Sequence, residues 1–221
     1  VTSHTKRSIE DHFDRNLELE SKLFSSNKES YLDKVNLNEY EGIKFSFVRQ
    51  IDQRGLGDAI SQVSHLILPD EYFAILLADD LFDGNPGVTS QLVDAFKLHG
   101  KSIIAVNEVS EEETKKYGVI SGELSGNLTS VEEIVEKPQS NPPSNLAVTG
   151  RYLLSGEIME ELKTLEPGFG NEIQLTDAIA KMLQKREMLG LKYDALKFDC
   201  GSKEGFVQAN IHFAKKQYII S

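Results

Sequence analysis

The chain has 221 residues, of which 39% are hydrophobic, and a formal net charge of −11. This length and composition are typical of a folded chain with a sizeable core rather than of a disordered one. The negative charge argues against nucleic-acid binding through a broad basic face, so a phosphate-bearing ligand would need local lysines, backbone amides or a metal ion. The single cysteine, Cys200, cannot form an internal disulfide, which favours a reducing, cytoplasmic setting.

We expect neither membrane association nor a secretion signal. The longest apolar run is about the length of a strand and well short of a membrane span. No charged-then-apolar leader precedes the first predicted helix. The chain opens on Val1 rather than on methionine, and this start looks like the tail of a strand whose beginning is missing.

The first quarter of the chain predicts helices and one strand. Apolar residues recur at helical spacing over 6–24 and predict one helix. The polar stretch 25–41 has room for a short helix. Apolar residues that alternate with period two over 43–49 predict a strand.

Two glycines follow that strand, in the order Gly55-Leu56-Gly57, and a helix is predicted over 58–68. A Gly-x-Gly turn before a helix lets a flat or anionic ligand approach the backbone closely. The pattern differs from the dinucleotide-binding fingerprint, because Ile60 stands where a third glycine would be. A tight strand-to-helix turn would explain these glycines equally well.

The middle of the chain is organised around an apolar run that ends in Asp79 and Asp80. The run predicts a strand over 72–78, and a helix over 88–99 and a strand over 101–108 follow it. This order of strand, helix and strand predicts a mostly parallel sheet with right-handed crossovers.

The second half of the chain predicts a hairpin, then further strands and helices. The predicted elements are strands over 117–121 and 128–135, a strand over 147–154, helices over 155–165 and 174–188, a strand over 196–199 and a helix over 203–216. We therefore expect an α/β fold with a Rossmann-like mixed, mostly parallel sheet flanked by helices and a small antiparallel hairpin insertion. Length and continuity favour one domain over 1–221.

Carboxylates at a strand end are well placed to bind a hard cation. In open α/β sheets ligands bind at the carboxyl ends of strands, and Mg²⁺ takes oxygen ligands and bridges to substrate phosphates. Asp79 and Asp199 each follow an apolar strand, and each precedes a glycine turn. If both strands point the same way, the two carboxylates could converge on one metal ion. The alternative is that these acids only end strands and cap turns.

Glu136, Lys137 and Pro138 form a second candidate for ligand binding. Lys137 offers a cation for a phosphate, and Glu136 offers an acceptor for hydroxyl groups. Pro138 cannot continue a strand ladder, so the chain turns outward there. The alternative is a solvated strand end, where charged residues are ordinary.

Seven motifs, taken in order, carry a resemblance to one family. They are R-Q-x-x-x-x-G-L-G-D-A-I, L-L-A-D-D, Y-G-V-I, V-E-E-I-V-E-K-P, G-R-Y-L-L, E-I-Q-L-T-D-A-I and F-D-C-G-S-K-E-G-F. In this order they make the chain similar to the bacterial UTP–glucose-1-phosphate uridylyltransferases, also called UDP-glucose pyrophosphorylases, from His4 to about Ala214. Sister sugar nucleotidyltransferases share the plan, and the last two motifs point to the uridylyl branch.

The resemblance implies a sugar nucleotidyltransferase fold that transfers a uridylyl group from UTP to glucose 1-phosphate, giving UDP-glucose and pyrophosphate. It also implies Mg²⁺ as cofactor and a homo-oligomer. The implied roles are Asp79 and Asp199 as Mg²⁺ ligands, Asp79 and Lys137 as catalytic residues, Gly118, Glu136, Lys137 and Glu172 around glucose 1-phosphate, and Gln50, Gly55 and Gly57 around the uracil. We expect Asp80 to support the loop rather than to bind metal.

One departure from the family bears on activity. Family members begin with a strand and a glycine-rich loop, carrying Arg and Lys, that wraps the triphosphate, and this segment is absent here. We therefore expect an N-terminally truncated chain that is inactive or weakly active by itself. Two other functions stay open on the residues alone: a metal-dependent glycosyltransferase and a non-catalytic nucleotide-sugar-binding domain.

Overall fold

The computed structural model describes residues 1–35 and 40–218. They form two compact units, Val1–Gln53 and Arg54–Ser221, and each unit is described by itself. The organisation of the chain as one domain over 1–221 stays a prediction.

The first unit is built from short helices rather than from one long one. Its helices are α1 (Arg7–His12), α2 (Leu17–Ser25), a 3₁₀ helix (Glu29–Tyr31) and α3 (Leu32–Val35). The single helix expected over 6–24 is therefore wrong. The break has a local cause, because the side chain of Asn16 accepts a hydrogen bond of 3.0 Å from the Leu19 amide and so starts a new helix. Part of the polar stretch 25–41, namely 36–39, lies outside the described residues.

The strand expected over 43–49 is not formed. The structure places one isolated parallel bridge there, between Thr2 and Arg49. The Thr2 amide donates to the Val48 carbonyl at 2.8 Å, and the Gln50 amide donates to the Thr2 carbonyl at 2.9 Å. An alternating pattern needs a partner strand along its length to become a strand, and this bridge supplies only the last residue or two of one.

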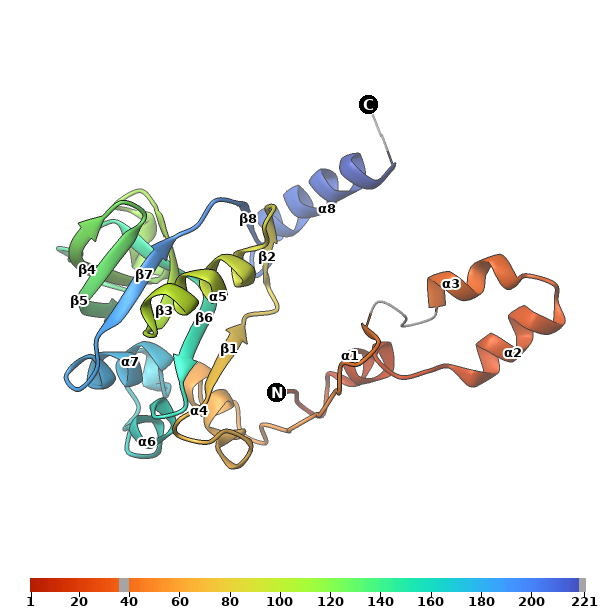
Figure 1. Cartoon of the computed structure of the whole chain (residues 1–221), viewed down its shortest axis with the longest axis horizontal. Coiled ribbons are helices and arrows are strands. Elements are labelled where there is room, and N and C mark those ends of the chain that lie inside the picture. The colour runs from red at the N-terminus through yellow and green to blue at the C-terminus, as the bar shows by residue number, and fades with distance from the viewer. Residues whose placement is uncertain (36–39, 219–221) are drawn as a thin grey trace. The chain divides into compact units, whose positions relative to one another are not determined.

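The second unit is an α/β structure (Figure 1). Its elements are α4 (Leu56–Ser61), a 3₁₀ helix (Ser64–Leu66), β1 (Tyr72–Leu76), β2 (Asp80–Asp83), α5 (Val88–His99), β3 (Ser102–Glu108), a 3₁₀ helix (Glu113–Lys116), β4 (Gly118–Ser125), β5 (Leu128–Glu136), β6 (Leu146–Ser155), α6 (Ile158–Lys163), a 3₁₀ helix (Phe169–Asn171), α7 (Leu175–Leu183), β7 (Met188–Lys192), β8 (Leu196–Asp199) and α8 (Lys203–Tyr218).

The main sheet has the strand order β1-β6-β3-β7-β5-β4, and β2 pairs with β8 in a separate two-stranded sheet. The expected class, a mixed α/β sheet flanked by helices, is confirmed. The expectation of mostly parallel neighbours is corrected, because β3 and β7 form the only parallel pair among the described strands. The cause is β6, which runs in the opposite direction between β1 and β3. These two strands point the same way, as expected, but do not touch as neighbours.

Helices cover both faces of this sheet and bury its apolar residues. On one face α4, α6 and α7 pack through buried side chains such as Ile158 and Ile179 against Ile104 of β3. On the other face α5 packs through Leu92 against Ile103. Alternate residues of β3 thus enter different layers, which explains why its sequence reads as a continuous apolar run. No helix of the described residues is long and apolar enough to cross a membrane.

Two strands were missed by the sequence patterns, and several helices were predicted too long. The helix expected over 58–68 ends as α4 at Ser61, and a separate 3₁₀ helix follows at Ser64–Leu66. The helix expected over 174–188 ends as α7 at Leu183, and Met188 begins β7, the parallel partner of β3. The apolar residues of β7 continue a helical pattern with no intervening glycine or proline, so periodicity alone could not separate the two. β2 was missed as well. The predicted hairpin is confirmed as the antiparallel pair β4–β5, which joins the main sheet at its edge.

Candidate active site

The small sheet β2–β8 brings two predicted carboxylates together. β2 and β8 are antiparallel, and Asp80 at the start of β2 pairs with Asp199 at the end of β8. Asp79 therefore lies beside Asp199, and its carbonyl accepts a hydrogen bond of 2.8 Å from the Cys200 amide. The convergence was expected from strands pointing the same way; the structure achieves it instead with opposed strands, because the start of one strand then meets the end of the other.

Both carboxylates face the small space beside Gly201. A methyl group added to Gly201 would lie 3.0 Å from Oδ1 of Asp199 and 3.2 Å from Oδ2 of Asp79. The Gly201 amide donates to Oδ1 of Asp199 at 3.0 Å, and the Tyr117 hydroxyl contacts Oδ2 of Asp199 at 3.4 Å. The glycine is what allows the turn after β8 to pass this close to two acids.

Asp80, next to this pair, forms an ion pair with a lysine. Its Oδ1 lies 2.8 Å from Nζ of Lys197, and the side chains of Asp80 and Lys197 are only 11% and 14% exposed. Burial raises the pKa of the Asp80 carboxyl above its ordinary value, and the Lys197 ammonium opposes that shift. The carboxylates of Asp79 and Asp199 raise the pKa further. This contact agrees with a supporting role for Asp80.

A polar pocket of about 340 Å³ opens beside these acids. Six of the predicted site residues line it: Asp79, Gly118, Glu136, Lys137, Glu172 and Asp199. The end of β5 supplies Glu136 and the residue after it, Lys137, while the start of β4 supplies Gly118. The pocket thus joins the acid pair to the second candidate motif, which lies far from it in the sequence.

Lys137 has an unusual backbone and two side-chain neighbours. Its φ is +44°, and its amide donates to the Tyr117 carbonyl at 3.0 Å. Its ammonium lies 3.5 Å from Oε1 of Glu136 and 5.6 Å from the centre of the Phe169 ring. The left-handed backbone turns the chain sharply where Pro138 ends the strand, so that the lysine faces the pocket.

Glu172 is fixed by the loop before α7. Its Oε2 accepts a hydrogen bond of 3.0 Å from the Gln174 side chain, and its carbonyl accepts one of 2.8 Å from the Gly168 amide. Gly55 and Gly57 pack against the same loop. A methyl group on Gly57 would lie 2.8 Å from the Ile173 carbonyl oxygen, and one on Gly55 would lie 2.7 Å from the same atom.

Gly55 and Gly57 do not line the pocket, although Leu56 between them does. The Gly57 amide donates to the Ile173 carbonyl at 2.8 Å. The structure therefore gives both glycines a packing role beside the Glu172 loop. Gln50 belongs to the first unit, where its amide bonds to Thr2. Contact of these three residues with a base stays a prediction.

The acid pair fits a hard divalent cation that also takes ligands from substrate. No group of three or more His, Cys, Asp and Glu side chains suited to a metal ion occurs among residues 1–35 and 40–218. An all-protein cage is thus not present in that part of the chain. Mg²⁺ is usually bound by one or two carboxylates together with waters and substrate phosphates, and Asp79 and Asp199 offer such a set.

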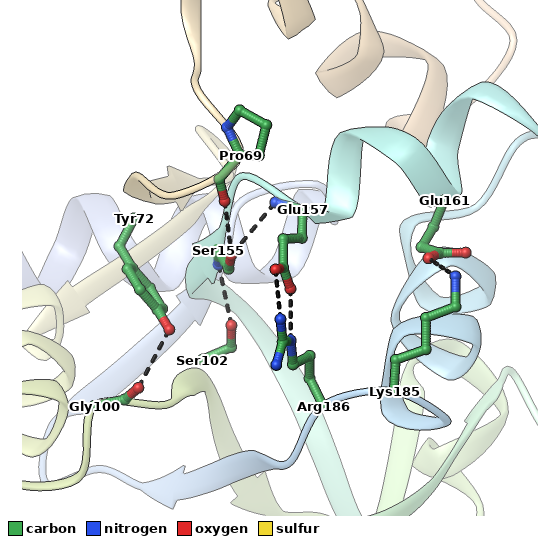
Figure 2. A network of polar contacts seen from close by, with 9 residues as sticks. All are labelled: Pro69, Tyr72, Gly100, Ser102, Ser155, Glu157, Glu161, Lys185 and Arg186. Atoms are coloured by element: carbon green, nitrogen blue, oxygen red, sulfur yellow. Dashed lines mark hydrogen bonds and ion pairs between the residues drawn. The ribbon is translucent and has the colours of Figure 1, made fainter.

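A second cavity, of about 530 Å³, lies at the opposite end of the strands, where β1 and β3 begin and β6 ends. Figure 2 shows its polar network, in which Arg186 holds Glu157 through two bonds of 2.8 Å. Lys185 is bound to Glu161 at 2.6 Å. These cations are already neutralised, so the network ties α6 to the segments after α7 and offers little to an anionic ligand.

Sequence reasoning missed four residues that shape the candidate site. They are Tyr117, Arg151, Thr176 and Lys197. Lys197 had a usable signal, because it stands two residues before Asp199 on a strand and so shares its face. Tyr117 adjoins a predicted glycine. Arg151 stands in the G-R-Y-L-L motif, but nothing in that motif indicates that it donates to the carbonyls of Leu77 and Asp80, at 2.9 and 2.8 Å.

The fold and this acid-lined pocket define a class of α/β transferase that acts on nucleotides. A family model described as nucleotidyl transferase matches residues 2–216, nearly the whole chain.

Close relatives narrow the class. A UTP–glucose-1-phosphate uridylyltransferase of Staphylococcus epidermidis is 42% identical over 218 residues, which are 98% of this chain and 75% of the relative. One of Pseudomonas aeruginosa is 43% identical over 213 residues, or 95% of this chain and 76% of the relative. The chain belongs to the nucleotidyl transferase family and, within it, to the UTP–glucose-1-phosphate uridylyltransferases.

Solved structures give the same answer for the fold. A UDP-glucose pyrophosphorylase complexed with UDP-glucose matches with a TM-score of 0.87 and 40% identity, over 98% of this chain and 80% of that one. The UTP-bound enzyme of Acinetobacter baumannii matches with a TM-score of 0.88 and 33% identity, over 99% of this chain and 76% of that one.

Proposed function

We propose that this chain transfers a uridylyl group from UTP to glucose 1-phosphate, giving UDP-glucose and pyrophosphate. The observation that carries the proposal is the single pocket that joins the Asp79–Asp199 pair to Glu136 and Lys137. A phosphate in this pocket can interact with the Lys137 ammonium on one side and with a divalent cation bound by Asp79 and Asp199 on the other. The relatives, which are named UTP–glucose-1-phosphate uridylyltransferases, support the same reaction.

Each side of the pocket receives one part of the substrates in this proposal. Lys137 binds the phosphate of glucose 1-phosphate, while Glu136 and Glu172 accept hydrogen bonds from sugar hydroxyls and Gly118 leaves room for the ring. Gly55 and Gly57 contact the uracil, and a contact of Gln50 with the base is kept as a prediction from the sequence alone. Asp79 and Asp199 hold the divalent ion.

Nucleotidyl transferases generally use a divalent metal ion. We propose Mg²⁺ for this chain, because the two hard carboxylates leave positions for phosphate oxygens. When bound, Mg²⁺ neutralises charge on the phosphates that react. A cytoplasmic location and a homo-oligomeric state belong to the same proposal; the single cysteine supports the first.

The reaction needs positioning more than acid–base chemistry. A phosphate oxygen of glucose 1-phosphate attacks the α-phosphorus of UTP in line, a new P–O bond forms, and the bond to the pyrophosphate oxygen breaks. The attacking phosphate is anionic at neutral pH, so the chain supplies no general base. Lys137 orients the nucleophile and reduces charge repulsion, and the walls of the pocket fix the angle of approach.

The test follows pyrophosphate release and UDP-glucose formation together, with Mg²⁺, UTP and glucose 1-phosphate, and measures UDP-glucose binding on the same samples. Equal amounts of the two products support the proposal, and their rate tests the expectation of weak turnover by this chain. Transfer of glucose from UDP-glucose to an acceptor would point to a glycosyltransferase instead. Absence of saturable binding of both UDP-glucose and glucose 1-phosphate would overturn the proposal.

A further inference from the structure

We propose that Lys197 is a positioning residue that sets the geometry of the two metal-binding carboxylates. The inference rests on the proposed function, because it takes Asp79 and Asp199 as the ligands of the divalent ion. Lys197 itself is directed to Asp80 and to Tyr117, and it acts on the site through these two neighbours.

The register of the small sheet explains how Lys197 reaches Asp80. Lys197 and Asp199 are two residues apart on β8, so their side chains leave the same face of the strand. Asp80 is directly opposite Asp199, which puts it on that face as well. The bond of 2.8 Å between Lys197 and Asp80 is therefore a diagonal cross-strand pair, and it locks β2 and β8 in the register that brings Asp79 beside Asp199.

A second contact connects Lys197 to Asp199 from another side. Its ammonium lies 4.8 Å from the centre of the Tyr117 ring, within the range of a cation–π contact. The Tyr117 hydroxyl lies 3.4 Å from Oδ2 of Asp199. Tyr117 also accepts the backbone bond from Lys137. Lys197 thus supports the tyrosine that spans the space between the acid pair and the phosphate-binding lysine.

Charge makes this support specific. The carboxylates of Asp79 and Asp199 lie close enough to Asp80 to raise the pKa of its carboxyl, and Lys197 is the side-chain cation bonded to Asp80. Arg151 is nearby and interacts electrostatically with Asp80 and Asp79, but the hydrogen bonds that it donates go to backbone carbonyls, and its guanidinium lies 4.6 Å from the Phe82 ring centre. Without Lys197, the largely buried Asp80 loses its partner and must rearrange beside both ligands.

The experiment compares Lys197→Met, Lys197→Arg and the wild-type chain. The dissociation constant for Mn²⁺ alone is measured by titration, and glucose 1-phosphate binding is measured without metal. Lys197→Met is expected to weaken Mn²⁺ binding tenfold or more and to change glucose 1-phosphate binding less than twofold. Lys197→Arg is expected to stay within threefold of wild type for Mn²⁺, because it keeps the cation.

Two further variants separate positioning from loss of a salt bridge in general. Lys216→Met removes a lysine that pairs with Asp83 at the other end of β2, and it is expected to leave Mn²⁺ binding unchanged. The double variant Asp80→Asn/Lys197→Met is expected to bind Mn²⁺ no more weakly than Lys197→Met, because the lysine acts through Asp80.

Unchanged Mn²⁺ affinity in Lys197→Met would overturn the inference, and so would an equal loss of Mn²⁺ and glucose 1-phosphate binding. Should Lys197→Met not fold, Lys197→Gln takes its place, because glutamine keeps a polar end in the site but removes the charge; Mn²⁺ binding is again expected to weaken while glucose 1-phosphate binding changes less than twofold. If the wild-type chain binds Mn²⁺ but neither UDP-glucose nor glucose 1-phosphate, the proposed function fails while the Mn²⁺ comparison still decides the role of Lys197.

Discussion

The hydroxyl of Thr176 donates a hydrogen bond of 2.6 Å to Oε2 of Glu136 and so joins the first turn of α7 to the end of β5. The other carboxylate oxygen of Glu136 is the one that faces Lys137, at 3.5 Å. Gly118 makes this arrangement possible, because a methyl group there would lie 3.1 Å from the threonine hydroxyl. The hydrogen bond from Thr176 therefore orients Glu136, the acid proposed to accept hydrogen bonds from the sugar hydroxyls.

Thr176→Val should disturb this orientation with little change in volume. A hydrogen bond to a charged group contributes about 1.5–3 kcal/mol, and its loss leaves Glu136 free to turn toward Lys137. We expect glucose 1-phosphate to bind about tenfold more weakly. Calorimetric titration checks this, with Thr176→Ser as the control that keeps the hydroxyl. Equal affinities of the valine and serine variants would contradict the role given to the bond.

Lys137→Met should weaken the binding of glucose 1-phosphate more strongly than that of glucose. The ammonium is the group proposed to meet the phosphate, whereas a neutral sugar makes no use of it. We expect at least a tenfold loss for the phosphate ester and less than a threefold change for glucose. Lys163→Met, which removes an exposed lysine paired with Glu160 on α6, is the matched control. Parallel losses for both ligands would point to a general change in the pocket.

Gly150→Ala should destabilise the fold by about 2–5 kcal/mol. Its φ of +68° is costly for alanine, by about 1–2 kcal/mol. The added methyl group would also lie 2.0 Å from Oδ2 of Asp80, and relieving such overpacking costs about 1–3 kcal/mol more. Gly100→Ala is the matched control, because Gly100 has a φ of +64° with no atom within 4 Å of the new methyl group.

Free energies of unfolding in urea separate the two contributions. Gly100→Ala should show the cost of the backbone alone, and the difference between the two variants is the cost of displacing Asp80. Gly150→Ala should also bind Mn²⁺ more weakly, whereas Gly100→Ala should not. Similar values for the two variants would mean that the Asp80 carboxyl moves aside without cost.

Sequence patterns predicted the helices and strands best where an element is long and buried on one clear face. The helix expected over 88–99 is α5, residue for residue, and the strand expected over 101–108 is β3 less one residue. They failed where tertiary pairing decides the outcome. Residues 43–49 alternate like a strand but form only one β-bridge. The start of β7 was assigned to the preceding helix, because its apolar residues extend the helical pattern of α7.

The candidate site divides in the same way. Asp79, Glu136, Lys137 and Asp199 stand at strand ends, so their chemistry could be seen before their positions were known. That Asp79 and Asp199 meet through opposed strands could not be seen, because β2 is only four residues long and carries no signal of its partner. The role of Thr176 could not be predicted either, because its partner, Glu136, lies forty positions away in the sequence.

The hydroxyl of Tyr117 gives a prediction about alkaline pH. Burial raises the pKa of Tyr117 to about 12, and the charges of Asp199 and Asp80 add to the rise. In the unfolded chain a tyrosine titrates near pH 10. The stabilisation from the neutral hydroxyl is therefore fully present below about pH 10 and is lost as the pH rises toward 12, because the unfolded state releases its proton first.

The free energy of unfolding should accordingly fall more steeply between pH 9 and pH 11 for the wild-type chain than for Tyr117→Phe. Urea denaturation at both pH values measures the two slopes. Tyr218→Phe, which removes a phenol exposed at the end of α8, is the control and should keep the wild-type slope. Identical slopes for wild type and Tyr117→Phe would show that Tyr117 titrates alike in the folded and unfolded chain. The bond to Asp199 would then not depend on a hydroxyl kept neutral by its surroundings.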